Sequence, residues 1–260
     1  MRWAKIEYNG DVSYGIIEGD QVALVEGGLF DGGKRTGKTA PLVDVKFQVP
    51  LIPTTFYAAG LNYVEHVLES AKSAGREPNI PDKPDIGYRA NNALIAHNEA
   101  IIKPKDSTEL FQYEGELVAI IGTQTKHISE ADALSCVFGY TIGNDVSERT
   151  WQRGDRTFWR GKNADTFKPM GPWIETDVDL DALETTVRLN GRDVITFPTN
   201  NMLFGVARYI SAMSRYLTLY PGDVIWMGTE GQSENMKPGD VCEVEISGIG
   251  TLSNPIIAEA

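Results

Sequence analysis

Short runs of alternating apolar and polar residues fill the first 50 positions of the chain. The segment RWAKIEYNGDVSYGIIEGDQVALVEG (2–27) is divided at Asn9-Gly10 and at Glu18-Gly19-Asp20, and both sequences favour the tight turns of β-hairpins. A stretch rich in Gly, Lys and Thr at 32–39 predicts a loop, and prolines 50 and 53 mark a boundary. We therefore predict a small antiparallel β domain over 1–50 and a larger domain over 51–260.

Two segments of the larger domain have helical periodicity. In NYVEHVLESAKSAG (62–75) the apolar positions 64, 67, 68 and 71 share one face, and His66 and Glu69 lie on the opposite face. Gly75 suits the C′ position that ends such a helix. A second helix is predicted over 201–219, capped by Asn200 or Asn201 and ended by Pro-Gly-Asp at 221–223.

Strand-like runs occupy much of the remaining chain, at 93–96, 113–121, 137–142 and 185–189 and again in the C-terminal segment. They do not alternate regularly with helices, which argues against a doubly wound parallel sheet. The pattern predicts a β-rich α/β protein of the α+β type.

Composition and charge narrow the functional classes. With 42% hydrophobic residues the 260-residue chain has a normal core, and its formal net charge of −12 argues against a nucleic-acid partner. No apolar run approaches the roughly 18 residues that span a bilayer. The N-terminal residues show no charged-then-apolar pattern, so we expect no secretory signal. Cys136 and Cys242 are far apart and lack metal-site spacing. We expect a cytoplasmic protein with inert thiols and no membrane partner.

Two carboxylates in FQYEGELVAIIG (111–122) are the first sign of chemistry. Glu114 and Glu116 are two positions apart in a strand-like run, so both point to the same face. One interpretation is an exposed face, where water solvates both groups. The other is a divalent cation that cancels their repulsion, with Asp145 of GYTIGNDVSERTWQ (139–152) as a third ligand or simply a turn residue. The residues alone leave both interpretations open.

Six blocks in a fixed order add to this picture: AGLNYVEH (59–66), YEGELVAIIG (113–122), GYTIGNDVSERTWQ (139–152), GKNADTFKPMGPWI (161–174), YPGDVIWMGT (220–229) and GDVCEVEISGIGTL (239–252). Together they resemble the fumarylacetoacetate hydrolase (FAH) family from about residue 53 to the C-terminus. The resemblance implies an FAH-like mixed β-sandwich roll, and the first 50 residues are similar to the small β domain of many bacterial members.

The resemblance also implies roles for individual residues. The metal ligands are Glu114, Glu116 and Asp145, which would hold Mg²⁺, with Mn²⁺ or Ca²⁺ as alternatives. The expected catalytic residues are His66 and Glu69, a dyad on a mobile lid, and Lys162. The expected substrate contacts are Arg149, Gln152 and Thr229. A histidine with a reference pKa near 6.5 suits the activation of water, and a carboxylate three residues later could hold its ring.

Two segments depart from the family pattern. The stretch 87–92 lacks the usual Lys-Pro-Pro-like sequence, so Arg89 is expected to replace the lysine as a carboxylate clamp. The loop Thr229-Glu230-Gly231-Gln232 carries a carboxylate and an amide where the family has a proline and an aliphatic residue. If this loop lines the pocket, the substrate is more polar than an aliphatic acylpyruvate.

These features predict a Mg²⁺-dependent hydrolase that cleaves a C–C bond in a β-diketo acid, an acylpyruvate- or fumarylpyruvate-like keto acid. The ion would stabilise an enolate and a His-Glu dyad would activate water. Decarboxylation or keto–enol isomerisation of a 2-keto acid on the same site is the alternative. A catalytically idle binding or scaffold protein is a further alternative. The resemblance also predicts a homodimer.

Overall fold

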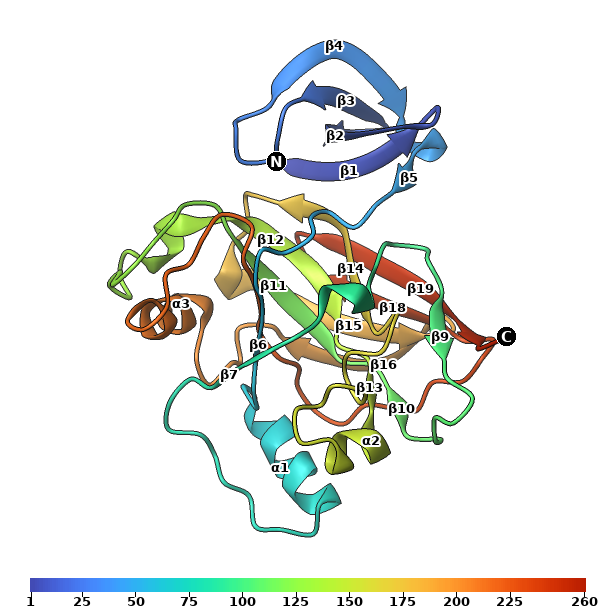
Figure 1. The fold of residues 1–260 in the computed structure, drawn as a ribbon, viewed down its shortest axis with the longest axis vertical. Helices are drawn as coiled ribbons and strands as arrows, with labels where there is room; N and C mark the ends of the chain where they lie inside the picture. Colours follow the sequence, from blue (N-terminus) through green and yellow to red (C-terminus); the bar gives the residue numbers. More distant parts are fainter.

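Two β-sheets packed against each other form the body of the protein, and a small sheet of N-terminal strands extends one of them (Figure 1). The computed structural model describes residues 1–260. The larger sheet has the strand order β4 (Lys34–Pro41), β3 (Gln21–Glu26), β2 (Asp11–Glu18), β1 (Arg2–Tyr8), β14 (Lys168–Glu175), β12 (Val137–Asn144), β11 (Gly115–Ile121), β17 (Val224–Trp226), β6 (Phe56–Ala59) and β7 (Ile86–Tyr88), with β5 (Lys46–Phe47) beside β1 and β8 (Leu94–Ile95) beside β14.

The second sheet and the helices complete the fold. The second sheet has the order β16 (Arg192–Pro198), β15 (Glu184–Leu189), β18 (Val241–Ile246), β19 (Gly250–Ala258) and β9 (Ile101–Lys103), and a separate pair is formed by β10 (Phe111–Gln112) and β13 (Ser147–Glu148). The helices are α1 (Val64–Ser73), α2 (Arg149–Gly154) and α3 (Val206–Ser214), with 3-10 turns η1 (Leu42–Asp44), η2 (Asn91–Ala93), η3 (Ala133–Cys136) and η4 (Leu180–Ala182). The protein is therefore β-rich with few helices, as predicted.

The N-terminal strands follow the turn chemistry of the sequence. Asn9 and Gly10 both have positive φ, 53° and 86°, and they join β1 to β2 in a two-residue hairpin. The loop predicted at 32–39 is wrong, because this stretch forms most of strand β4, paired with β3 across a register shift. Strand β1 also pairs with β14 at Arg2 and Trp3, so the small sheet continues into the larger one.

Strand β11 lies at the centre of the molecule and is buried along its whole length. Leu117 and Ile121 on one face join the main core between the two sheets, while Val118 and Ile120 on the other face join a second core. That second core includes Trp3 and other residues of the N-terminal strands. A strand buried on both faces needs a near-continuous apolar run, which explains the sequence of 117–121.

Helix α1 ends as the sequence predicted. Gly75 has a φ of 62° and donates to the carbonyl of Lys72, and the N–H of Arg76 donates to the carbonyl of Ala71. These two bonds are the Schellman arrangement, which only a residue tolerant of positive φ allows. The following residue, Arg76, is thereby fixed relative to the helix.

Helix α3 is shorter than the predicted 201–219. It begins after Gly205, without a side-chain cap, because the preceding backbone is bonded elsewhere: Leu203 and Phe204 donate to the backbone and side-chain oxygens of Asn62. Asn201, expected as a cap, instead donates to Glu230. None of the helices is both long enough and apolar enough to cross a lipid bilayer.

Candidate metal centre and active site

Pairing of β11 with β12 brings the three predicted metal ligands together. Glu116 lies opposite Gly143, and the N–H of Asp145 donates to the carbonyl of Glu114 at 2.8 Å. Asn144 reinforces this end of the ladder, since its side-chain oxygen accepts from the N–H of Glu114 at 3.0 Å. Glu114 and Glu116, at the start of β11, therefore lie close to Asp145, which directly follows β12.

Two glycines make room for this arrangement. A Cβ on Gly115 would lie 2.9 Å from methyl groups of both Val187 and Val244 in the second sheet. A Cβ on Gly143 would lie 2.6 Å from the ring of Trp226. Both positions are too tight for a side chain, so Gly115 allows the second sheet, and Gly143 allows the ring of Trp226, to pack closely beside the acidic pair.

The three carboxylates converge and are buried. The exposed fractions are 4% for Glu114, 2% for Glu116 and 1% for Asp145. One ligand oxygen from each lies within 4.8 Å of the others. The exposed-face interpretation of Glu114 and Glu116 is therefore wrong, and the residues form a potential ligand set for a divalent ion.

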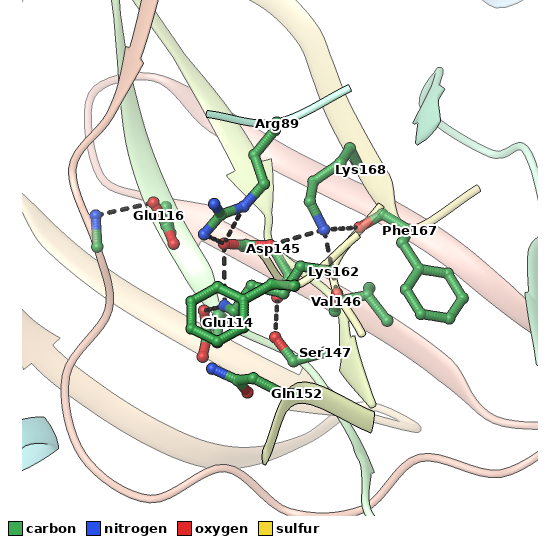
Figure 2. Close-up of polar contacts among 12 residues, drawn as sticks. Arg89, Glu114, Glu116, Asp145, Val146, Ser147, Gln152, Lys162, Phe167 and Lys168 are labelled. Atoms are coloured by element: carbon green, nitrogen blue, oxygen red, sulfur yellow. Dashed lines mark hydrogen bonds and ion pairs between the residues drawn. The ribbon is translucent and has the colours of Figure 1, made fainter. Parts of the chain in front are cut away.

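Cations gather at two of the three carboxylates (Figure 2). The contacts to Asp145 come from Arg89 at 2.8 Å, Lys162 at 3.0 Å and Lys168 at 2.6 Å. Those to Glu114 come from Lys162 at 2.6 Å and Arg149 at 2.5 Å. Burial alone would raise both pKa values, but these cations outweigh it and lower the pKa of each carboxyl below its usual range.

Glu116 differs from its neighbours because no cation contacts it. It accepts a hydrogen bond from the N–H of Gly228 at 2.8 Å. Burial, together with repulsion from Asp145 and Glu114, raises its pKa to about 8. A divalent ion would supply the positive charge that Glu116 lacks, and three carboxylates are the hard oxygen donors that Mg²⁺, Mn²⁺ and Ca²⁺ prefer. The residues present therefore fit such an ion.

The His66 ring lies beside this acidic centre. Its Nδ1 is 3.0 Å from the carbonyl oxygen of Gly231, and its Nε2 is 3.8 Å from Oε1 of Glu114. A carbonyl can only accept, so Nδ1 carries the proton and Nε2 is the basic nitrogen. Burial lowers the pKa of His66 below 6.5, which favours the neutral ring.

The role expected for Glu69 is filled differently in the structure. Glu69 lies 3.7 Å from Lys72, its neighbour on α1, and the ring nitrogen that it was expected to hold is bonded to Gly231 instead. A spacing of three places both side chains on one helix face, but the loop carrying Gly231 supplies the partner of Nδ1. A catalytic role for Glu69 stays a prediction.

Arg89 is also used differently from the expectation. Its Nε and Nη2 both donate to Oδ2 of Asp145, at 3.1 and 2.8 Å, and Nη1 donates to the carbonyl of Tyr88. The guanidinium therefore clamps a carboxylate of the protein, and because Arg89 also lines the cavity of the acidic centre, its contact with a substrate stays a prediction. The reason for the clamp is burial, since Asp145 is 1% exposed and needs neutralisation.

The remaining predicted residues line the same region. Arg149 connects the centre to its surroundings, because it also donates to Gln112 and Gln152. Lys162 bridges Glu114 and Asp145, as described above. Lys162, Gln152 and Thr229 all line a cavity of about 620 Å³ together with Glu114, Glu116 and His66.

Sequence reasoning missed two residues of the centre. Lys168 is fully buried, its pKa is lowered to about 8 chiefly by burial, and it also donates to the carbonyls of Val146 and Phe167. Asn62 is buried and its amide donates to the carbonyls of Phe204 and Met227. Neither had a signal in the chain beyond its position within a family-like block, since its partners are far away in sequence.

Comparison with known proteins agrees with this geometry. A model described as the fumarylacetoacetate (FAA) hydrolase C-terminal domain matches residues 55–257, and one described as an Rv2993c-like N-terminal domain matches residues 1–50. The chain belongs to the fumarylacetoacetate hydrolase family.

Relatives of this FAH-family protein catalyse several reactions. It is 40% identical to the 2,4-didehydro-3-deoxy-L-rhamnonate hydrolase of a Sphingomonas species, over 75% of this chain and 70% of that one. It is 33% identical to a mitochondrial oxaloacetate tautomerase of Rattus norvegicus, over 84% and 71%. The crystal structure of a 5-carboxymethyl-2-hydroxymuconate delta-isomerase from Mycobacterium smegmatis superposes with a TM-score of 0.90, at 35% identity and full coverage of both chains.

The residues of loop 229–232, which departs from the family pattern, lie in two different environments. Gly231 and Gln232 line a second cavity beside the acidic centre. Glu230 is buried and accepts from the amide of Asn201, while its other oxygen, Oε2, has no partner. Burial raises the pKa of Glu230. Gln232 therefore contributes a polar residue to that cavity, and a more polar substrate stays a prediction.

Proposed function

We propose that this FAH-family protein hydrolyses a C–C bond of a β-diketo acid in a divalent-metal-dependent reaction. One observation carries the proposal: a neutral histidine with a fixed tautomer lines the same cavity as Glu114 and Glu116, two of the three converging carboxylates. The hydrolase relative supports the reaction class. When bound, the ion would polarise the keto oxygens of the substrate and stabilise negative charge that develops on them.

The residues of the chain would then handle the proton and the geometry. Nε2 of His66 takes a proton from water, and the resulting hydroxide adds to the distal carbonyl carbon. The C–C bond breaks, its electron pair passes to the enolate of the keto acid fragment, and a carboxylic acid is the second product. The Gly231 carbonyl stabilises the charged ring, because it accepts from Nδ1.

Lys162 and Arg149 support this chemistry through the carboxylates. Both neutralise Glu114 at short range, so that the centre holds its ligand geometry without excess negative charge. Gln152 accepts a hydrogen bond from Arg149 and lines the cavity, where it would orient a polar substrate group. Thr229 lines the same cavity and would contact the substrate there.

Loss of enol absorbance from acylpyruvates in the presence of Mg²⁺ tests the proposal. Wild type should cleave them to pyruvate and a carboxylic acid, and Glu116→Ala should not. Inactivity of both proteins over a broad panel of diketo acids would favour a binding or scaffold role instead.

Tautomerisation or decarboxylation of a 2-keto acid is a second candidate, favoured by two relatives at 33% and 35% identity. One is the oxaloacetate tautomerase, and the other is a bifunctional isomerase/decarboxylase of Salmonella dublin. Both reactions need the same polarised keto acid but no attacking water. Release of CO₂, or interconversion of oxaloacetate tautomers without a carboxylic acid product, would select this candidate.

We also propose that the protein acts as a cytoplasmic homodimer. Sedimentation at micromolar concentration should give twice the chain mass, and a 28.6 kDa species would contradict the dimer.

A further inference from the structure

A short loop after β17 contacts both parts of the candidate site. The N–H of Gly228 donates to Oε2 of Glu116 at 2.8 Å, and the carbonyl oxygen of Gly231 lies 3.0 Å from Nδ1 of His66. We call residues 228–231 the linking loop. A shift of this loop would therefore change the surroundings of a potential metal ligand and of the proposed base together.

The backbone of the linking loop does not fix its own conformation. None of its residues makes a backbone–backbone hydrogen bond, and Gly228 and Gly231 have φ of 87° and 73°. Glycines restrict the chain least at such angles. The backbone of Gly231 packs closely against Ile195, since a Cβ there would lie 2.5 Å from its Cδ1, but apolar packing has no preferred direction. The direction of the Gly231 carbonyl must therefore be set by hydrogen bonds.

Glu230 bonds the linking loop to a part of the protein outside the site. Its Oε1 accepts from Nδ2 of Asn201 at 2.8 Å, and Glu230 lines neither of the two cavities. The hydrogen bonds of Gly228 and Gly231, by contrast, lead back to the site itself. The contact between Glu230 and Asn201 is therefore the directional restraint that can hold the loop independently of the site.

The Glu230 carboxyl is buried under unfavourable conditions. It is 7% exposed, and its second oxygen, Oε2, is buried without a partner. A buried polar atom that has lost its water and found no partner destabilises the folded state. The family pattern has a proline at this position, which has no carboxyl to bury. A local cost of this kind is typical of positions that serve function rather than stability.

The partner of Glu230 lies in a segment that also holds helix α1. In the segment 199–204, which contains Asn201, the first residue accepts at its carbonyl from the hydroxyl of Tyr63 at 2.7 Å, and the last two donate their N–H groups to Asn62 at 2.7 and 3.0 Å. Asn62 and Tyr63 directly precede α1, the helix that carries His66. One segment therefore fixes both partners of the hydrogen bond at the His66 ring.

We propose that Glu230 is a positioning residue for the base. Through its bond to Asn201 it holds the Gly231 carbonyl against Nδ1 of His66, so that the ring keeps the tautomer in which Nε2 is free to accept a proton. The effect on turnover rests on the proposed function, whereas the effect on the ring does not.

NMR of the full-length protein with ¹⁵N-labelled histidine rings tests the proposal at saturating Mg²⁺ and pH 8, where His66 is neutral because its pKa lies below 6.5. The chain has three histidines, and the signals that disappear in His66→Gln identify this ring. Wild type should carry the proton on Nδ1. Glu230→Ala should lose about tenfold in the ratio of the Nδ1–H to the Nε2–H tautomer, the magnitude of one hydrogen bond. A proton on Nε2 in wild type would overturn the proposal.

Three further variants separate positioning from a general loss of stability. Glu230→Gln keeps an acceptor for Asn201 and should keep the wild-type tautomer. Asn201→Ala removes the same hydrogen bond from an exposed position, so it should shift the tautomer even if Glu230→Ala does not fold. Asn200→Ala is the matched control, because this exposed neighbour donates to the carbonyl of Asp181 instead. A wild-type tautomer in Asn201→Ala, or an equal shift in Asn200→Ala, overturns the proposal.

Turnover measured in parallel separates this inference from the proposed function. If acylpyruvates are cleaved, kcat of Glu230→Ala should fall about tenfold with KM nearly unchanged, because Glu230 lines neither cavity, and Glu230→Gln should restore it. If no keto acid is cleaved but the tautomer depends on Glu230, the hydrolase proposal falls and the positioning role stands. If acylpyruvates are cleaved and every variant keeps the wild-type tautomer, the positioning role falls and the hydrolase proposal stands.

Discussion

The carbonyl oxygen of Gly231 lies 3.0 Å from Nδ1 of His66, in a loop 165 residues further along the chain. This contact assigns the proton to Nδ1 and leaves Nε2 as the base facing Glu114. The group that orients the ring is therefore a backbone oxygen, which never titrates, and not a carboxylate.

Substitution of His66 tests this assignment. His66→Gln should lower kcat by about 10²–10⁴-fold, the usual contribution of a positioned base. Burial disfavours the imidazolium, so the acid limb of kcat/KM in wild type should lie below pH 6.5. Activity is lost as pH falls through that pKa, because protonation removes the base. His127→Gln, an exposed histidine outside both cavities, serves as control, and unchanged turnover in His66→Gln would exclude the role.

The variant Glu116→Gln tests whether metal binding, measured as a metal-induced rise in Tm, needs the charge on Glu116. Wild type should show a rise in Tm with Mn²⁺ that corresponds to about 2.7 kcal/mol at a hundred times Kd. Glu116→Gln should lose most of it, because the one carboxylate without a cation is gone. The exposed Glu26→Gln should retain it.

The same variant gives a pH signature in metal-free protein. The folded-state pKa of Glu116 is raised to about 8, so its neutral form is favoured by folding. Stability from this group is complete below its unfolded pKa and is lost as pH rises through about 8. Metal-free Glu116→Gln should therefore be more stable than wild type at pH 9, by ~2 kcal/mol, and similar at pH 4. If wild type and Glu116→Gln have equal free energies of unfolding in urea at both pH values, the charge of Glu116 is not left uncompensated in the metal-free protein.

Gly115 should tolerate no side chain. In Gly115→Ala the new methyl group meets Val187 and Val244 at 2.9 Å, and overpacking of this kind costs about 1–3 kcal/mol in unfolding free energy. Metal affinity should fall as well, because the residue lies between two ligands. Gly154→Ala is the control, since it meets open space and has no positive φ. A wild-type denaturation midpoint in Gly115→Ala would show that the sheets can separate there.

Asn62 should prove essential for the position of α1. Asn62→Ala removes an amide that makes two hydrogen bonds with Phe204 and one with Met227. The buried backbone groups left without partners should lower the free energy of unfolding by about 2–4 kcal/mol. Because α1 carries His66, kcat should fall further than stability alone explains when measured well below Tm. Asn91→Ala, which loses one bond to Pro53 at the surface, should leave both quantities nearly unchanged.

Local signals in the sequence determined the hairpins and the ligand set. Asn9-Gly10 forms a turn because its residues tolerate positive φ, and Gly75 ends α1 for the same reason. Glu114 and Glu116 share a face because a strand repeats every two residues. The order of the family-like blocks then predicted the fold and named Asp145 as the third ligand. These conclusions depend on neighbours in the chain or on whole motifs.

Only the tertiary structure decided which charges meet. Lys168 reaches Asp145 from β14, Arg89 binds Asp145, and the Gly231 carbonyl contacts the His66 ring. The length of α3 was likewise set by Asn62, about 140 positions earlier. A buried charge or polar group is satisfied by whatever partner folding brings near it, and strand pairing between distant segments, which no local pattern encodes, selects that partner.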